Sequence, residues 1–117
     1  MPDLAPVEQR LFDHVRGERC PFETLLSTGV LSQEWADGYL ELLKEAQQRW
    51  QHEPCWPREL VAAVHIVSTE LDVRYRAWCG FGRGPRNERT ERLLNQARIS
   101  SEFFLLAPVT EKGNVAA

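Results

Sequence analysis

The chain has 117 residues, of which 43% are hydrophobic and 26% are charged, and its formal net charge is −3. This length suffices for one domain with its own core, and the ordinary composition excludes collagen-like chains, disordered chains and disulfide scaffolds. The first residues carry charges of both signs without an apolar stretch, unlike a secretion signal, and no apolar run reaches the length of a membrane span. We therefore expect a single domain in the cytoplasm that does not contact a membrane.

Three amphipathic helices are predicted in the first half of the chain. The first runs from about residue 6 to 16 and a short second one from about 21 to 28. A third begins after Ser32, a residue type that caps helix N-termini, and runs to about Gln51. Because the break that follows is short, we expect the third and fourth helices to be neighbours in space.

The segment 57–79 predicts a long central helix. Pro57 suits the first helical position, and Gly80 suits the stop. Apolar residues recur at spacings of three and four, which defines a core stripe: Leu60, Val64, Val67, Leu71, Tyr75 and Trp78. Further apolar residues widen this surface, which predicts contacts on more than one side: Val61, Ala62, Ala63, Ile66, Val73 and Ala77.

A last long helix is predicted to begin after Asn87 as its N-cap and to end at Pro108, with 109–117 as a disordered tail. Its expected inward residues are Leu93, Leu94, Ala97, Phe103 and Phe104. No alternating run of β-branched residues indicates a strand. The sequence therefore predicts an all-α domain over 1–108, a bundle of four to five helices around the helix at 57–79.

The central helix also carries a polar seam. His65, Thr69, Asp72 and Arg76 follow one another at helical spacing, and Glu70 with Arg74 forms a pair of opposite charges four residues apart. The ordinary interpretation is solvated or interhelical polar contacts. The functional alternative is a helical enzyme or a small-ligand-binding domain, which would require a pocket on which His65 and Arg76 converge.

An arginine cluster follows the central helix in the glycine-rich stretch GFGRGPR and the helix after it. Arg83, Arg86 and Arg89, with Arg92 beyond them, would suit phosphate or nucleic-acid binding. However, a helix rather than a strand precedes the glycines, and glutamates interleave with the arginines. A connection between two helices is the simpler interpretation, and we do not expect nucleic acid as a partner.

No metal, cofactor or catalytic residue is predicted. Cys20, Cys55 and Cys79 have no metal-binding or disulfide spacing, which predicts reduced thiols. Cys79 lies at the C-terminal end of a helix, where the helix dipole disfavours a thiolate. An enzyme is therefore not the expected class.

Residues 1–72 carry 13 acidic and 6 basic side chains, whereas residues 73–117 carry 4 and 8. The third helix has an acidic face, and Trp56 at a helix entrance would suit an exposed anchor. We therefore expect a protein–protein interaction module, an immunity-like inhibitor or a self-associating regulator, that binds another protein or forms a homo-oligomer. The interface candidates are Glu34, Asp37, Glu41, Glu45 and Trp56.

Overall fold

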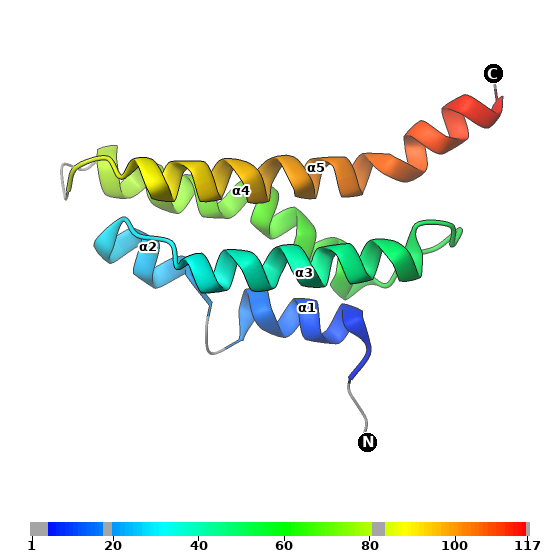
Figure 1. The fold of residues 1–117 in the computed structure, drawn as a ribbon, viewed down its shortest axis with the longest axis horizontal. Helices are drawn as coiled ribbons and strands as arrows, with labels where there is room; N and C mark the ends of the chain where they lie inside the picture. Colours follow the sequence, from blue (N-terminus) through cyan, green and yellow to red (C-terminus); the bar gives the residue numbers. More distant parts are fainter. Residues whose placement is uncertain (1–4, 18–19, 81–83, 117) are drawn as a thin grey trace.

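The computed structural model describes residues 5–17, 20–80 and 84–116. These residues form five α-helices and no strand, which confirms the all-α prediction (Figure 1). The helices are α1 (Val7–Arg16), α2 (Phe22–Thr28), α3 (Gln33–Trp50), α4 (Arg58–Gly80) and α5 (Glu88–Ala116).

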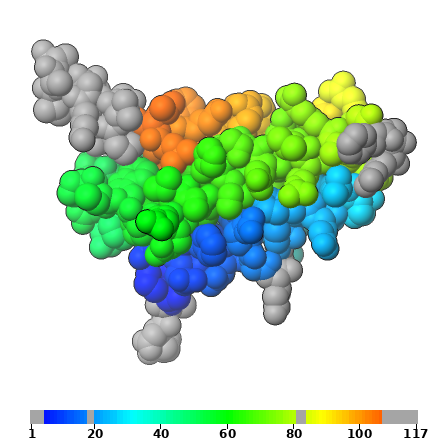
Figure 2. Space-filling model, turned by 180° about the vertical axis from the view of Figure 1, so that it is seen from behind, coloured from blue at the N-terminus to red at the C-terminus, as the bar shows by residue number. Residues whose placement is uncertain are grey.

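The helices pack into a flat body with extents of 48 × 43 × 20 Å. α4 packs against α5, α1 and α2, and α3 packs against α1 and α5. Seen from behind, α4 crosses the molecule between α5 and α1 (Figure 2). The expectation that the third and fourth helices are neighbours was wrong, because the described backbones of α3 and α4 do not approach each other closely.

α4 contacts neighbours on more than one side, as predicted, since it packs against α5, α1 and α2, but part of its apolar surface stays uncovered. Five residues of its predicted stripe are in the core, with Leu60 and Val64 fully buried and Tyr75 only 5% exposed, whereas Trp78 at its end is half-buried. Val61 and Val73, which were expected to widen the packed surface, are 38% and 62% exposed. Because the body is only two helix layers thick, the other face of α4 remains at the surface.

Two small polar residues of α5 lie in the core. Thr90 Oγ1 accepts a hydrogen bond from the backbone N–H of Leu31 at 3.0 Å. Ser101 Oγ donates to the carbonyl oxygen of Ala97 at 2.7 Å and lies 2.6 Å from the Tyr39 hydroxyl, which therefore donates to it. Burial raises the pKa of Tyr39. These bonds allow polar groups to occupy core positions without the cost of an unsatisfied donor or acceptor.

The predicted caps are present at two helix starts. Ser32 Oγ accepts from the backbone N–H of Trp35 at 3.2 Å, and Asn87 Oδ1 accepts from that of Thr90 at 2.9 Å. α5, however, does not end at Pro108 but continues to Ala116, and its ribbon bends toward that end (Figure 1). A proline removes one helical hydrogen bond and can bend a helix without ending it. The disorder of 109–117 in solution stays a prediction.

Candidate interaction surface

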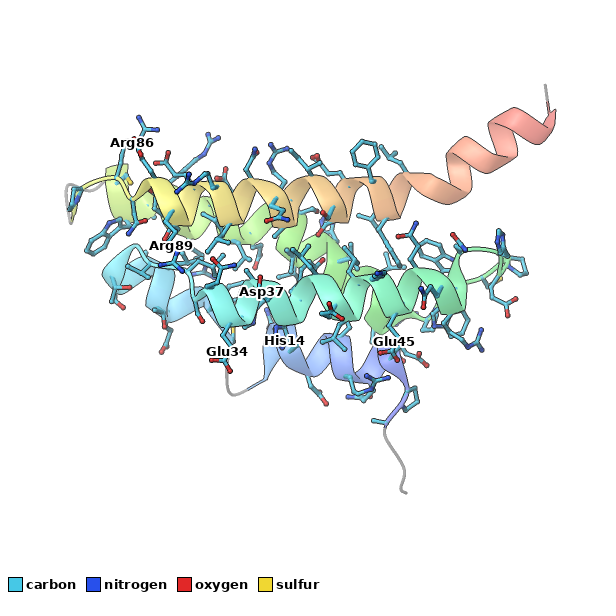
Figure 3. All side chains as sticks on the ribbon, viewed as in Figure 1. His14, Glu34, Asp37, Glu45, Arg86 and Arg89 are labelled. Atoms are coloured by element: carbon cyan, nitrogen blue, oxygen red, sulfur yellow. The ribbon has the colours of Figure 1, made fainter. Side chains whose placement is uncertain are left out.

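The acidic face of α3 is exposed but partly neutralised. Glu34, Asp37 and Glu45 lie along α3 (Figure 3). Arg10 of α1 forms an ion pair with Glu45, and this hydrogen bond lowers the pKa of the Glu45 carboxyl. Asp37 accepts a hydrogen bond from the Gln33 amide at 2.9 Å. Within the described residues, Glu34 and Glu41 have no such partner, so they are the carboxylates of this face left for another molecule.

Trp56 is not an exposed anchor. Its side chain is half-buried, and its ring centroid lies 4.8 Å from that of the buried Phe104. It therefore ties the connection before α4 to α5. As an interface candidate it offers only part of its indole ring.

The polar seam of α4 does not converge on one pocket. His65 is exposed, and its backbone carbonyl accepts hydrogen bonds from two hydroxyl groups of its own helix. Asp72 pairs with Arg76 at 2.7 Å, while the Arg74 guanidinium lies over the Phe22 ring of α2 at 5.5 Å from its centroid. Within the described part of the chain, the expected pair between Glu70 and Arg74 is not formed.

The arginine cluster is likewise divided. Arg83 lies outside the described residues. Arg86 lies just before α5 and Arg89 in its first turn (Figure 3), and Arg89 donates to the Gln33 side-chain oxygen of α3 at 3.4 Å. Arg86 makes two hydrogen bonds to Glu91, at 2.8 and 2.6 Å. These arginines therefore do not jointly face one ligand.

A groove of about 850 Å³ lies between α4 and α5. Four arginines and three carboxylates line it, together with Tyr75, Cys79, Leu94 and Asn95. The charged residues are Arg76, Arg86, Arg92, Arg98, Asp72, Glu88 and Glu91. The carboxylates offset most of the positive charge, and Arg92 is the one lining arginine without an ion pair among the described residues. Two groups of residues that are separate in the sequence therefore meet in a nearly neutral groove.

One hydrogen-bond network joins three residues that line this groove, Tyr75, Arg86 and Glu91. The Tyr75 hydroxyl donates to Glu91 Oε2 at 2.7 Å and accepts from the backbone N–H of Asn87 at 2.7 Å. The hydrogen bonds from Arg86 and then Tyr75 lower the pKa of Glu91 to about 2. Burial raises the pKa of Tyr75 to about 12. The network holds the start of α5 against the end of α4.

We expect this network to make the free energy of unfolding depend on pH in the acidic range. The pKa of Glu91 in the folded protein is about 2, below the ordinary glutamate value of 4.5, so its contribution to stability is present above pH 4.5 and is lost as the pH falls toward 2. Glu91→Gln should therefore destabilise the protein at neutral pH, with a deficit that shrinks in acid. Urea unfolding across this pH range measures it, with Glu88→Gln as the control. A deficit of equal size at both ends of the range would contradict the assignment.

The least expected surface is the outer side of α5. Ile99, Phe103 and Leu106 are 39%, 70% and 55% exposed, and their spacing of four and three residues places them on one side of the helix. We call these three residues the α5 stripe. Phe103 was expected in the core and that expectation was wrong, because Phe104 is buried instead, at 2% exposed.

The helical phase explains why the stripe was missed. Thr90, Leu94, Ala97, Ser101 and Phe104 share the buried side of α5. Two of these five, Thr90 and Ser101, are polar. A prediction that assigns only apolar residues to the core therefore does not recognise this side of the helix, and it placed Phe103 inward. The tyrosine partner of Ser101 lies 62 positions away in the sequence, and no local pattern indicates it. The spacing of Ile99, Phe103 and Leu106 was the available signal.

Comparison with known proteins found no matching family model, no matching curated protein and no matching solved structure. Among the described residues, no helix combines the length and apolar character that a membrane span requires. The same residues contain no group of three or more His, Cys, Asp or Glu side chains placed to hold a metal ion.

Proposed function

We propose that this chain is a helical protein–protein interaction module that binds its partner through the α5 stripe. The observation that carries the proposal is the 70% exposure of Phe103 between Ile99 and Leu106. Removing a large apolar side chain from water contributes about 1.5–3 kcal/mol, so three such residues on one helix side favour association. In this proposal the module acts in the cytoplasm as an inhibitor or a self-associating regulator.

The acidic face of α3 provides a second contact in this proposal. Glu34 and Glu41 are exposed and unpaired among the described residues, which favours a basic surface on a partner. Such exposed charges mainly raise association rates and weaken in salt, whereas the apolar stripe supplies affinity. We therefore place the main contact on α5.

A second candidate function is the binding of a small anionic ligand in the groove between α4 and α5. The observation that favours it is the gathering of four arginines around one groove of about 850 Å³. Three of them already form ion pairs with carboxylates, as Arg76 does with Asp72 at 2.7 Å. A ligand would have to compete with these carboxylates, and for this reason we rank this function below protein binding.

The proposal is tested by a photo-cross-linking amino acid placed at Phe103 in the cells that produce the protein. We expect cross-links to a protein surface from position 103, because this side chain would lie inside the interface. The same group at Glu41 reports on the acidic face, and at the exposed Thr24 of α2 it serves as the control. If position 103 gives no more cross-linked product than position 24, the proposed function is wrong.

A further inference from the structure

The α5 stripe lies on an accessible edge of the molecule. α5 forms one long edge of the flat body, and it continues beyond the other helices at its C-terminal end (Figure 1). In the described structure, no other helix covers the side that carries Ile99, Phe103 and Leu106. An elongated partner surface, such as another helix, can therefore lie along it.

The shape of the stripe suits a helix. Residues spaced by four and three form a ridge along one helix, and such a ridge packs between the side chains of a facing helix. Antiparallel packing of two equal helices would bring the same stripe together from both sides. A twofold axis repeats every contact, so even a short stripe buries its apolar surface twice in the dimer.

A pair of opposite charges flanks the stripe. Arg98 Nη1 lies 3.1 Å from Glu102 Oε2, and Arg98 Nη2 donates to the Asn95 side-chain oxygen at 2.6 Å. Both charged side chains are partly exposed, at 38% and 48%. The flank is therefore electrically neutral but polarised along the helix, with the cation toward its N-terminus.

These two features have nearly the same centre. Ile99 and Phe103 are centred on Ser101, and Arg98 and Glu102 are centred on Ser100. A twofold axis at this point of two antiparallel α5 helices would set Ile99 against Phe103 of the second copy. It would also set Arg98 against Glu102 of the second copy, on the side where flanking residues of paired helices form ion pairs.

We propose that the partner on the α5 stripe is a second copy of this chain, bound by antiparallel α5–α5 packing about a twofold axis that crosses the stripe at the level of residues 100 and 101. This inference rests on the proposed function and names its partner. Charge complementarity favours a second copy as the partner. In this arrangement Arg98 of the second copy faces Glu102, and Glu102 of the second copy faces Arg98. A uniformly acidic or basic partner would meet one like charge on the same flank.

The first test is the mass of the purified full chain in light scattering and sedimentation over about a hundredfold range of concentration. We expect a dimer that dissociates on dilution, and Phe103→Asp should weaken it at least about tenfold while circular dichroism stays unchanged. Val73→Asp is the matched control, because Val73 is similarly exposed, at 62%, but lies on α4. A monomer throughout, or a dimer equally weakened by both variants, would overturn the inference.

The second test exchanges the charges at residues 98 and 102, which would face each other across the twofold axis. Arg98→Glu and Glu102→Arg should each weaken the dimer, because each would surround the axis with like charges. Mixing the two variants should restore association, since every residue 98 would then face an opposite charge at residue 102 of the other chain. A purely structural role of the Arg98–Glu102 pair within one helix cannot produce this rescue. The same exchanges at the pair formed by Arg49 in the last turn of α3 and Glu53 just after it, 3.2 Å apart, are the control.

The outcomes separate the two proposals. A dimer that dissociates with Phe103→Asp and is rescued by mixing supports both. A monomeric protein that cross-links from position 103 to a different protein leaves the proposed function standing and overturns the second copy as its partner. A monomer that gives no cross-link above the control at position 24 removes both.

Discussion

Tyr39→Ala is expected to lower the free energy of unfolding by about 3–5 kcal/mol, the usual cost of removing a large aromatic side chain from a core. Tyr39 is fully buried in α3, its ring stacks on Trp35 with centroids 5.5 Å apart, and its hydroxyl bonds to Ser101 of α5. The loss is a large part of the 5–15 kcal/mol typical of a domain. Urea unfolding followed by circular dichroism measures it.

The hydroxyl contribution is separated by a conservative control. Tyr39→Phe keeps the packing and removes one hydrogen bond, so we expect a loss of only about 1 kcal/mol. Ser101 keeps its bond to the Ala97 carbonyl oxygen and is not left without a partner. Should Tyr39→Phe cost as much as Tyr39→Ala, packing would not be the main contribution of this residue.

Gly29→Ala is expected to lower the free energy of unfolding by more than about 2 kcal/mol, because a strained backbone and a steric overlap add together. Gly29 ends α2 with φ 69°, a region that disfavours side chains. An added Cβ would lie 2.1 Å from Trp78 Nε1, so the indole of α4 would have to move. The Trp78 N–H would then lose its 3.2 Å hydrogen bond to the Pro85 carbonyl oxygen.

Gly80→Ala is the matched control for this substitution. Gly80 is the last residue of α4, and an added Cβ would meet nothing within 4 Å. Alanine favours helix over glycine by roughly 1 kcal/mol, so this variant should be neutral or more stable. Thermal unfolding of both variants compares them. If Gly29→Ala were as stable as Gly80→Ala, the close packing of Trp78 on Gly29 would be refuted.

Predictions from the local sequence were confirmed where a single residue determines the local structure, as at a helix cap. Ser32 and Asn87 were predicted as caps, and each accepts the hydrogen bond expected of that position. Gly38 lies inside α3, and a Cβ there would lie 3.0 Å from the His14 ring of α1, so this glycine marks a close helix crossing. Side-chain chemistry and backbone freedom at a single residue are enough for such predictions.

The candidate site was less predictable, because its parts depend on which helices meet. Asp72 and Arg76 were predicted as a seam and Arg86 as part of an anion cluster, yet all three line one groove. His65, from the same seam, lies exposed outside it. Spacing along a helix places residues on one side of it, but the packing of α5 decides which of them are covered.

The sequence by itself determined the all-α class, the positions where the helices begin and the core stripe of α4, since these follow from residue chemistry and a 3.6-residue period. Only the tertiary structure decided that α3 and α4 are not neighbours and that Phe103 faces outward. For the first, α3 and α4 each pack on α1 and α5 rather than on each other. For the second, the physical reason is the hydrogen bond between Tyr39 and Ser101. It allows a serine to occupy the core side of α5, and the rotation of the helix that this sets places the apolar stripe in solvent.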